Sequence, residues 1–144
     1  MIRVYIASKI QYAPQFRGYR RNWLIDGVFV NSRWIDMADA EWATPRKINV
    51  PPEEFRMCWL VDEQDVKDCQ ALIIYGAQQD KLRGALVEAG MAIAMGKPVF
   101  AVGGHPDFSS WQHHPLVMPA DSFDHAKTMI IERFNGHART GLRG

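Results

Sequence analysis

The sequence is short of cysteine, of long apolar runs and of net charge, and each shortage excludes a class of protein. Its 144 residues include two cysteines, Cys58 and Cys69, which lie outside any paired motif and are therefore expected to be buried thiols instead of disulfide, redox or metal sites. No apolar run approaches the roughly 20 residues that a membrane-spanning helix needs. The net charge of +1 offers no field that would attract nucleic acid or an acidic membrane, so any bound anion is expected to be small.

Metal-ligand spacing and a targeting segment are missing as well. Among the five histidines, His113 and His114 are adjacent, and neighbours in sequence rarely point at one ion. We therefore predict neither a metal nor a cofactor. The first residues, MIRVYIASKI, have the pattern of a strand instead of a signal peptide, which predicts a cytoplasmic protein.

What is present is the composition of a soluble globular protein. Apolar residues make up 47% of the chain and charged residues 23%, which is close to the average for such proteins. The length suits one compact domain, and the chain has neither internal repeats nor low-complexity tracts. We therefore predict a single domain over residues 1–144.

Apolar runs of strand length alternate with segments of helical period, and this alternation predicts the fold class. Such a chain folds as a three-layer α/β domain around a mostly parallel sheet, here of five strands and flavodoxin-like or Rossmann-like. A loop is expected at 36–50, where the periodicity is poor. The expected strands cover residues 2–7, 26–34, 71–76, 98–103 and 116–118, and the expected helices cover an Arg-rich segment before Leu24 and residues 51–69, 82–95 and 122–135.

Ligands of such folds bind beyond the carboxyl ends of the strands, so residues that follow strands are candidate site residues. This rule selects Ser8 and Lys9 after the first strand, residues 32–34 at the second, 76–79 after the third and 103–107 after the fourth. Glu88 also comes close to this edge, because it lies about one turn into the helix expected at 82–95.

Glu88 is the single carboxylate in the otherwise apolar segment 82–104. Small residues around it indicate a helix that packs closely on the sheet, and Val87, Met91 and Met95 form an apolar line along it. One interpretation is a glutamate that faces solvent from a buried helix. The other is a carboxylate in a semi-apolar cleft, where desolvation and helix dipoles tune its reactivity as a base or nucleophile.

The pattern G-x-x-x-E-x-G-x-A at residues 84–92, followed by GKPV at 96–99, resembles the nucleoside 2-deoxyribosyltransferase family and its nucleotide N-glycosidase relatives. This resemblance implies an N-glycosyl transferase or hydrolase in which Glu88 attacks the anomeric carbon of the sugar. Residues 4–10, VYIASKI, resemble the first strand of the family and its substrate-contacting turn, and residues 62–75 resemble the acidic helix that leads into the next strand. The resemblance therefore places Ser8, Lys9 and Gly84 at the substrate.

Three further residue roles and an oligomeric state follow from the resemblance. An aspartate on the helix before the third strand serves the nucleobase or the acid/base step; Asp62 fits best and Asp65 is the alternative, while an exposed acidic helix face would explain both. Tyr5 would orient the carboxylate or belong to the core. Asp107 resembles a loop residue that reaches the sugar hydroxyls of a neighbouring subunit's site, and a homo-oligomer is implied.

The remaining candidates concern the substrate. Arg17 and Arg20 belong to a basic cluster that could hold a 5′-phosphate, or they lie on a solvated helix face. Trp34 could stack on a nucleobase or pack in the core. The sequence departs from the transferase pattern at Leu86, where a glycine is common, and at 79–83, where an aspartate usually contacts the sugar. A nucleoside, a nucleoside 5′-monophosphate and NAD all remain open as substrates, as does a non-catalytic module that binds a nucleotide or a nucleotide-derived signal.

Overall fold

Five parallel strands form one sheet at the centre of the molecule. The computed structural model describes residues 1–37 and 50–143, with side chains up to residue 136. The sheet order is β2-β1-β3-β4-β5 with every pair parallel, which is the flavodoxin-like order. The predicted α/β class and five-stranded sheet are thus confirmed. The strands are β1 (Ile2–Ala7), β2 (Val28–Val30), β3 (Ala71–Tyr75), β4 (Val99–Val102) and β5 (Val117–Ala120).

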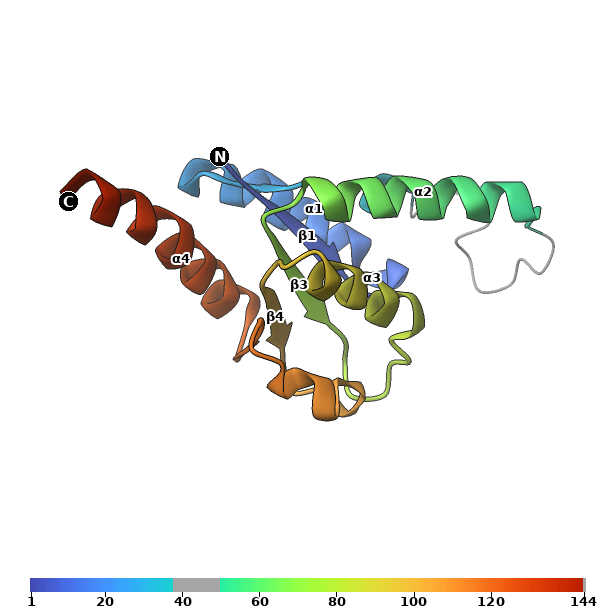
Figure 1. Ribbon diagram of the computed structural model, residues 1–144. Helices are drawn as coiled ribbons and strands as arrows, with labels where there is room; N and C mark the ends of the chain where they lie inside the picture. Colours follow the sequence, from blue (N-terminus) through green and yellow to red (C-terminus); the bar gives the residue numbers. More distant parts are fainter. Residues whose placement is uncertain (38–49, 144) are drawn as a thin grey trace.

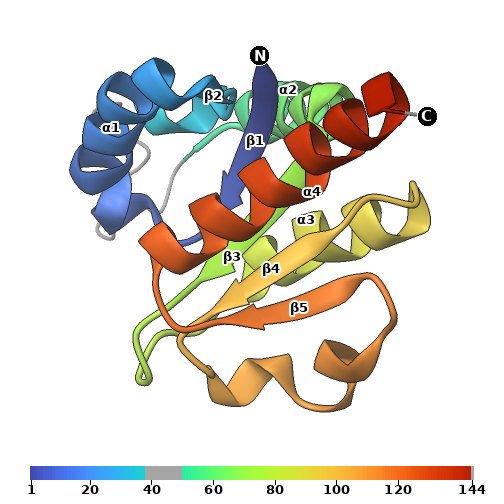
Figure 2. The same cartoon turned by 90° about the vertical axis from the view of Figure 1, so that its left-hand side faces the viewer.

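Helices cover both faces of this sheet and make three layers. Figure 1 shows α2 and α3 on one side of the sheet and α4 on the other, and in Figure 2 α4 crosses in front of the strands while α3 lies behind them. Because both faces are covered, the inner strands β1 and β3 are almost continuously apolar. The α-helices among the described residues are α1 (Ala13–Asn22), α2 (Pro52–Asp68), α3 (Arg83–Ala94) and α4 (Phe123–Arg143).

The two helical layers bury different kinds of side chain. The layer of α1 and α4 holds large aromatic residues, among them Phe16, Trp23 and Phe123. The layer of α2 and α3 is built largely from small and aliphatic residues, so that α3 lies close to the sheet. No helix in the described part of the chain is long and apolar enough to cross a membrane.

The second strand is shorter than the sequence predicts. It ends at Val30, and the 3₁₀ segment η3 (Arg33–Met37) follows where strand was expected up to Trp34. The hydroxyl of Ser32 accepts the backbone N–H of Ile6 at 2.7 Å, so a side chain replaces the next backbone bond of the ladder and releases the chain into a turn.

The end of α4 and the loop predicted at 36–50 also differ from the sequence-based expectation. Helix α4 continues to Arg143, beyond the predicted end near residue 135, because Gly136 does not take the left-handed backbone conformation of a helix C-cap. The loop predicted at 36–50 begins instead with the last two residues of η3, and residues 38–49 lie outside the described residues.

Candidate active site

Glu88 lies on the inward face of α3. Ala85, Ala89 and Ala92 share this face, at the spacing of one helical stripe, and all are buried. Glu88 is 6% exposed, and Oε2 of its carboxyl group has no hydrogen-bond partner. Burial raises its pKa to about 8, because the charged form loses solvation that nothing replaces. Of the two interpretations of Glu88 that the sequence allowed, the position of its side chain agrees with a carboxylate in a semi-apolar environment and not with a glutamate that faces solvent.

The apolar line that the sequence indicates along α3 is not the buried stripe. Val87 is half exposed, and Met95 is also exposed. The helix packs through its alanines instead, and these short side chains bring Glu88 close to the sheet.

Asp62 lies on α2, across the same layer from Glu88. It is partly buried, and its Oδ1 has no hydrogen-bond partner. Burial and the nearby charge of Asp65 raise its pKa to about 7, and Arg33 opposes this effect. A carboxyl group with this pKa can hold and release a proton near neutral pH.

Tyr5 is the third buried group without a partner in this layer. Its side chain on β1 is fully buried among the residues that α2 and α3 cover, and its hydroxyl makes no hydrogen bond. Buried polar groups are nearly always paired, so unpaired groups commonly mark a ligand site. Among the described residues four buried side-chain oxygens lack a partner, and they belong to Tyr5, Asn31, Asp62 and Glu88.

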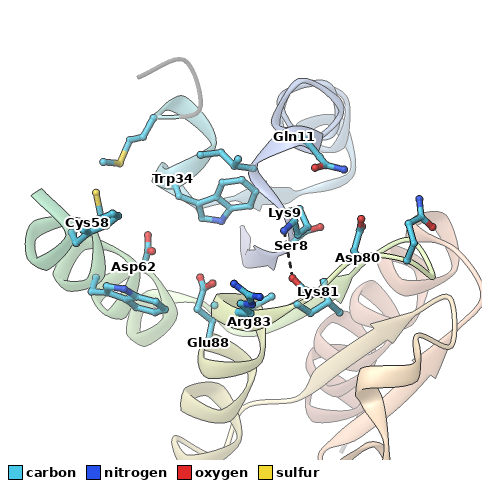
Figure 3. A pocket seen from close by; sticks show the side chains of 18 residues that line it. Ser8, Lys9, Gln11, Trp34, Cys58, Asp62, Asp80, Lys81, Arg83 and Glu88 are labelled. Carbon is cyan, nitrogen blue, oxygen red and sulfur yellow. Dashed lines mark hydrogen bonds between the residues drawn. The ribbon is translucent and has the colours of Figure 1, made fainter. Parts of the chain in front are cut away.

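A cavity of about 600 Å³ is lined by two of these four residues, Asp62 and Glu88. Figure 3 shows Asp62 and Glu88 pointing into the space below Trp34. The indole N–H of Trp34 donates to the carbonyl of Ile6 at 2.8 Å, which holds the ring in place over the ends of the strands. The cavity is lined by residues 8–11, Trp34, Met37, Phe55, Cys58, Trp59, Asp62, residues 79–85 and Glu88.

Of the residues predicted at the substrate, Ser8, Lys9, Trp34 and Gly84 line this cavity. Ser8 donates its hydroxyl to the carbonyl of Tyr75 at 2.7 Å, which joins the ends of β1 and β3. Gly84 lies in the first turn of α3, where a side chain would meet the ring of Trp59.

The predicted arginines do not line the cavity. Arg20 makes a two-pronged bond to Asp36, at 2.8 and 2.7 Å, which raises the pKa of the guanidinium. A guanidinium of Arg17 donates to the carbonyl of Ile35 at 3.1 Å. Both arginines thus hold η3 against α1. The sequence pattern did not reveal the pairing of Arg20 with Asp36, because these two residues are 16 positions apart.

The structure brings other cations to the cavity, namely Lys81 and Arg83 in addition to Lys9. Figure 3 shows Arg83 beside Glu88 at the start of α3, where the first backbone N–H groups of the helix also have no partner within it. Sequence reasoning missed these two residues, although they follow the third strand. The rule that selects residues beyond strand ends would have reached them if applied a few positions further.

Asp65 and Asp107 lie outside the cavity lining. The carboxylate of Asp65 is buried and bonds with Arg33. Asp107 accepts the backbone N–H of Leu82 at 3.3 Å, and its own N–H donates to Nδ1 of the buried His105. Asp107 therefore supports the start of α3 within its own chain. No group of three or more potential metal ligands occurs among the described residues.

Comparison with solved structures identifies a protein of the same fold. The chain is similar to the CMP N-glycosidase BcmB of Clostridium botulinum, with a TM-score of 0.54 and 17% sequence identity, over 89% of this chain and 96% of that one. The resemblance to the nucleoside 2-deoxyribosyltransferase family and its N-glycosidase relatives is thereby confirmed at the level of the fold. No family model matches the sequence, and a search of curated proteins found no match.

Proposed function

We propose that the protein cleaves the N-glycosidic bond of a nucleoside 5′-monophosphate, with Glu88 as the attacking carboxylate. The observation that carries this proposal is the position of Glu88, buried on the inward face of α3 beside the cavity with one oxygen unpaired. A structural glutamate would have its oxygens paired or in water. The likeness of the fold to that of a CMP N-glycosidase supports the reaction class.

In the first step, the ionised Glu88 attacks C1′ and the bond from C1′ to the base nitrogen breaks. The electron pair of that bond goes to the base, which takes a proton from Asp62, and a glycosyl ester forms on Glu88. In the second step, the oxygen of a water molecule attacks C1′, and Asp62 takes a proton from that water. The ester bond breaks, Glu88 leaves as carboxylate and the sugar phosphate is released.

The cations at the cavity support a phosphorylated substrate. Lys9, Lys81 and Arg83 line one part of it, together with the N-terminus of α3. Free N–H groups and the positive end of a helix dipole favour an anion. The aromatic rings of Trp34 and Trp59 line another part and offer surfaces on which a base could stack.

The test is release of free base from nucleosides, nucleoside monophosphates and NAD, measured by chromatography. Glu88→Gln is expected to lose at least about a thousandfold in kcat/KM. The matched control is Glu63→Gln, at a half-exposed glutamate paired with Lys67 on α2. A wild-type protein that acts on none of these substrates, or a Glu88→Gln variant that keeps its activity, would reject the proposal and leave a binding module.

Two variants test the phosphate. Lys81→Met and Arg83→Met are expected to raise KM for the monophosphate by about tenfold each, the effect of losing one charge-assisted bond, and to leave KM for the corresponding nucleoside unchanged. Equal effects on both substrates would contradict a phosphate site at these residues.

Exchange of bases is the alternative outcome of the second step. A second base that occupies the cavity would attack C1′ in place of water, which makes the protein a deoxyribosyltransferase. The size of the cavity, about 600 Å³, supports this alternative because it has room for more than a water molecule. Adding a labelled free base to the reaction distinguishes the two, since only transfer yields a labelled nucleotide.

A homo-oligomer is part of the proposal. The exposed apolar side chains of Phe55, Met57, Leu60 and Val87 on α2 and α3 support it, because such side chains commonly mark an interface. Light scattering of the purified protein measures its mass in solution, and a monomer at all concentrations would contradict this part. The predicted cytoplasmic location stays a prediction.

A further inference from the structure

One ion pair, between Arg33 and Asp65, joins η3 to α2, and both of these elements contribute residues to the cavity lining. Arg33 in η3 donates its backbone N–H to Oδ2 of Asp65 and its side-chain Nε–H to Oδ1, each at 2.9 Å. Its Nη2 also lies 2.9 Å from Oδ1. The Asp65 side chain is 5% exposed, whereas that of Arg33 is 57% exposed. The carboxylate is thus fixed inside the protein and held from outside by three contacts.

The partners of this pair are sequence neighbours of cavity residues. Arg33 directly precedes Trp34, whose ring lies above the cavity (Figure 3), and Asp65 follows Asp62 by one helical turn. A second hydrogen bond ties the segment just before η3 to the same helix, because the amide of Asn31 donates to the backbone carbonyl of Asp65 at 2.9 Å. The ion pair therefore links the element that carries Trp34 to the helix that carries Asp62.

We propose that Arg33 and Asp65 are positioning residues that set the gap between Trp34 and Asp62, and so align a stacked base with its proton donor. The functional role rests on the proposed N-glycosidase activity, in which Trp34 contacts the base and Asp62 protonates it. Displacement of a proton donor by about 1 Å can cost a hundredfold in rate, so a rigid link between the two walls matters for this chemistry.

The pair also acts on Asp62 by charge, and its two members act in opposite directions. The carboxylate of Asp65 raises the pKa of Asp62, whereas the guanidinium of Arg33 lowers it. If the two residues acted only through packing, removing either one would change the burial of Asp62, and hence its pKa, in the same direction. The charged or titratable groups around Asp62 are Cys58 and Asp65 on α2, Arg33 on η3, Glu88 on α3 and Tyr5 on β1.

The test compares Asp65→Asn with Arg33→Met. Each variant is expected to raise KM by about tenfold, because the Trp34 wall loosens. The pKa of Asp62, followed by carboxyl-carbon NMR, is expected to fall in Asp65→Asn and to rise in Arg33→Met, and the pH optimum of kcat/KM moves with it. Asp26→Asn is the matched control, since it removes the carboxylate of another ion pair, with Lys127, on the other side of the sheet.

Arg33→Lys separates charge from geometry. Lysine keeps the positive charge but lacks the planar fork, so it is expected to leave the pKa of Asp62 near its wild-type value while KM stays raised. Because Arg33 is largely exposed, its variants carry the test even if Asp65→Asn does not fold.

Shifts of the Asp62 pKa in the same direction in Asp65→Asn and Arg33→Met, or an unchanged KM in both, would overturn the proposal. The NMR titration needs no turnover. A protein with no N-glycosidase activity but opposite shifts of the Asp62 pKa would therefore reject the proposed function and retain the electrostatic link.

Discussion

The two faces of the sheet have been filled in contrasting ways. Under α1 and α4 lie packed aromatic rings, with Phe123 in contact with Phe16, Tyr19, Trp23 and Tyr75 at centroid distances of 4.9 to 6.5 Å. Under α2 and α3 lie alanines and carboxyl groups, and three buried oxygens there have no partner. One layer thus stabilises the fold, while the other holds unpaired polar groups at a cost in stability, which is the trade-off that the proposed active site predicts.

The largest expected effect on stability comes from the aromatic layer. Phe123→Ala should lower the free energy of unfolding by about 3–5 kcal/mol, because it opens a cavity among four rings. Urea unfolding measures the loss, and kcat/KM at low temperature should stay within about twofold. Phe29→Ala, at a partly exposed phenylalanine on edge strand β2, is the control. A loss below about 1 kcal/mol for Phe123→Ala would remove the contrast between the layers.

In the layer of α2 and α3, replacing the carboxyl group of Glu88 with a neutral amide should stabilise the protein. The pKa of Glu88 rises from 4.5 to about 8 on folding, so the folded state takes up a proton and the free energy of unfolding falls as the pH rises between these values. Glu88→Gln should therefore gain up to about 3–5 kcal/mol near pH 8.5 and little near pH 5. Equal effects at both pH values, or a gain of the same size in Glu63→Gln, would contradict the burial of an unpaired carboxyl.

The pH dependence of kcat/KM tests the roles proposed for Glu88 as the attacking carboxylate and Asp62 as the proton donor. The proposed mechanism needs a protonated Asp62 and an ionised Glu88, whose pKa values are raised to about 7 and about 8. At any pH, less than about a tenth of the free enzyme has Asp62 protonated and Glu88 ionised at the same time. A plot of kcat/KM against pH should therefore be bell-shaped, with its maximum between the two pKa values. In Asp62→Asn, the remaining activity should rise with pH through the pKa of Glu88 and then level off. A fall at high pH in that variant would identify another proton donor.

The smallest expected effect concerns Tyr5. Tyr5→Phe removes a buried hydroxyl without a partner, so the free energy of unfolding should rise by about 1 kcal/mol. Tyr12→Phe is the matched control with the opposite sign, because the Tyr12 hydroxyl donates to Asp80 at 2.6 Å. Thermal unfolding of both variants measures the difference. A loss of stability in Tyr5→Phe would show that its hydroxyl has a partner in solution.

The sequence was sufficient for most of the fold. Its alternation of strand-length apolar runs and helical segments predicts the elements and the parallel sheet, because such patterns depend on near neighbours in the chain. It failed at the end of β2, where the hydroxyl of Ser32 bonds to the distant N–H of Ile6. A contact across 26 residues leaves no local pattern.

The site was only partly predictable. The position after a strand selects Lys9 and Trp34, and a lone carboxylate in a small-residue helix selects Glu88. The arginines that the sequence offered as one possible phosphate site bind other parts of the fold, and Lys81 and Arg83 reach the cavity instead. Long cations have many partners within reach, and only the fold decides which one each of them meets.

By itself, the sequence determined the order of the elements, the ligand edge of the sheet and the place of Glu88 near it. Only the tertiary structure decided that Glu88 faces inward with one oxygen unpaired, that Asp65 is paired with Arg33, and that Asp62 also has an unpaired oxygen. The physical reason is that helical period and strand length are local properties. Desolvation and charge pairing depend on groups that folding brings together from distant parts of the chain.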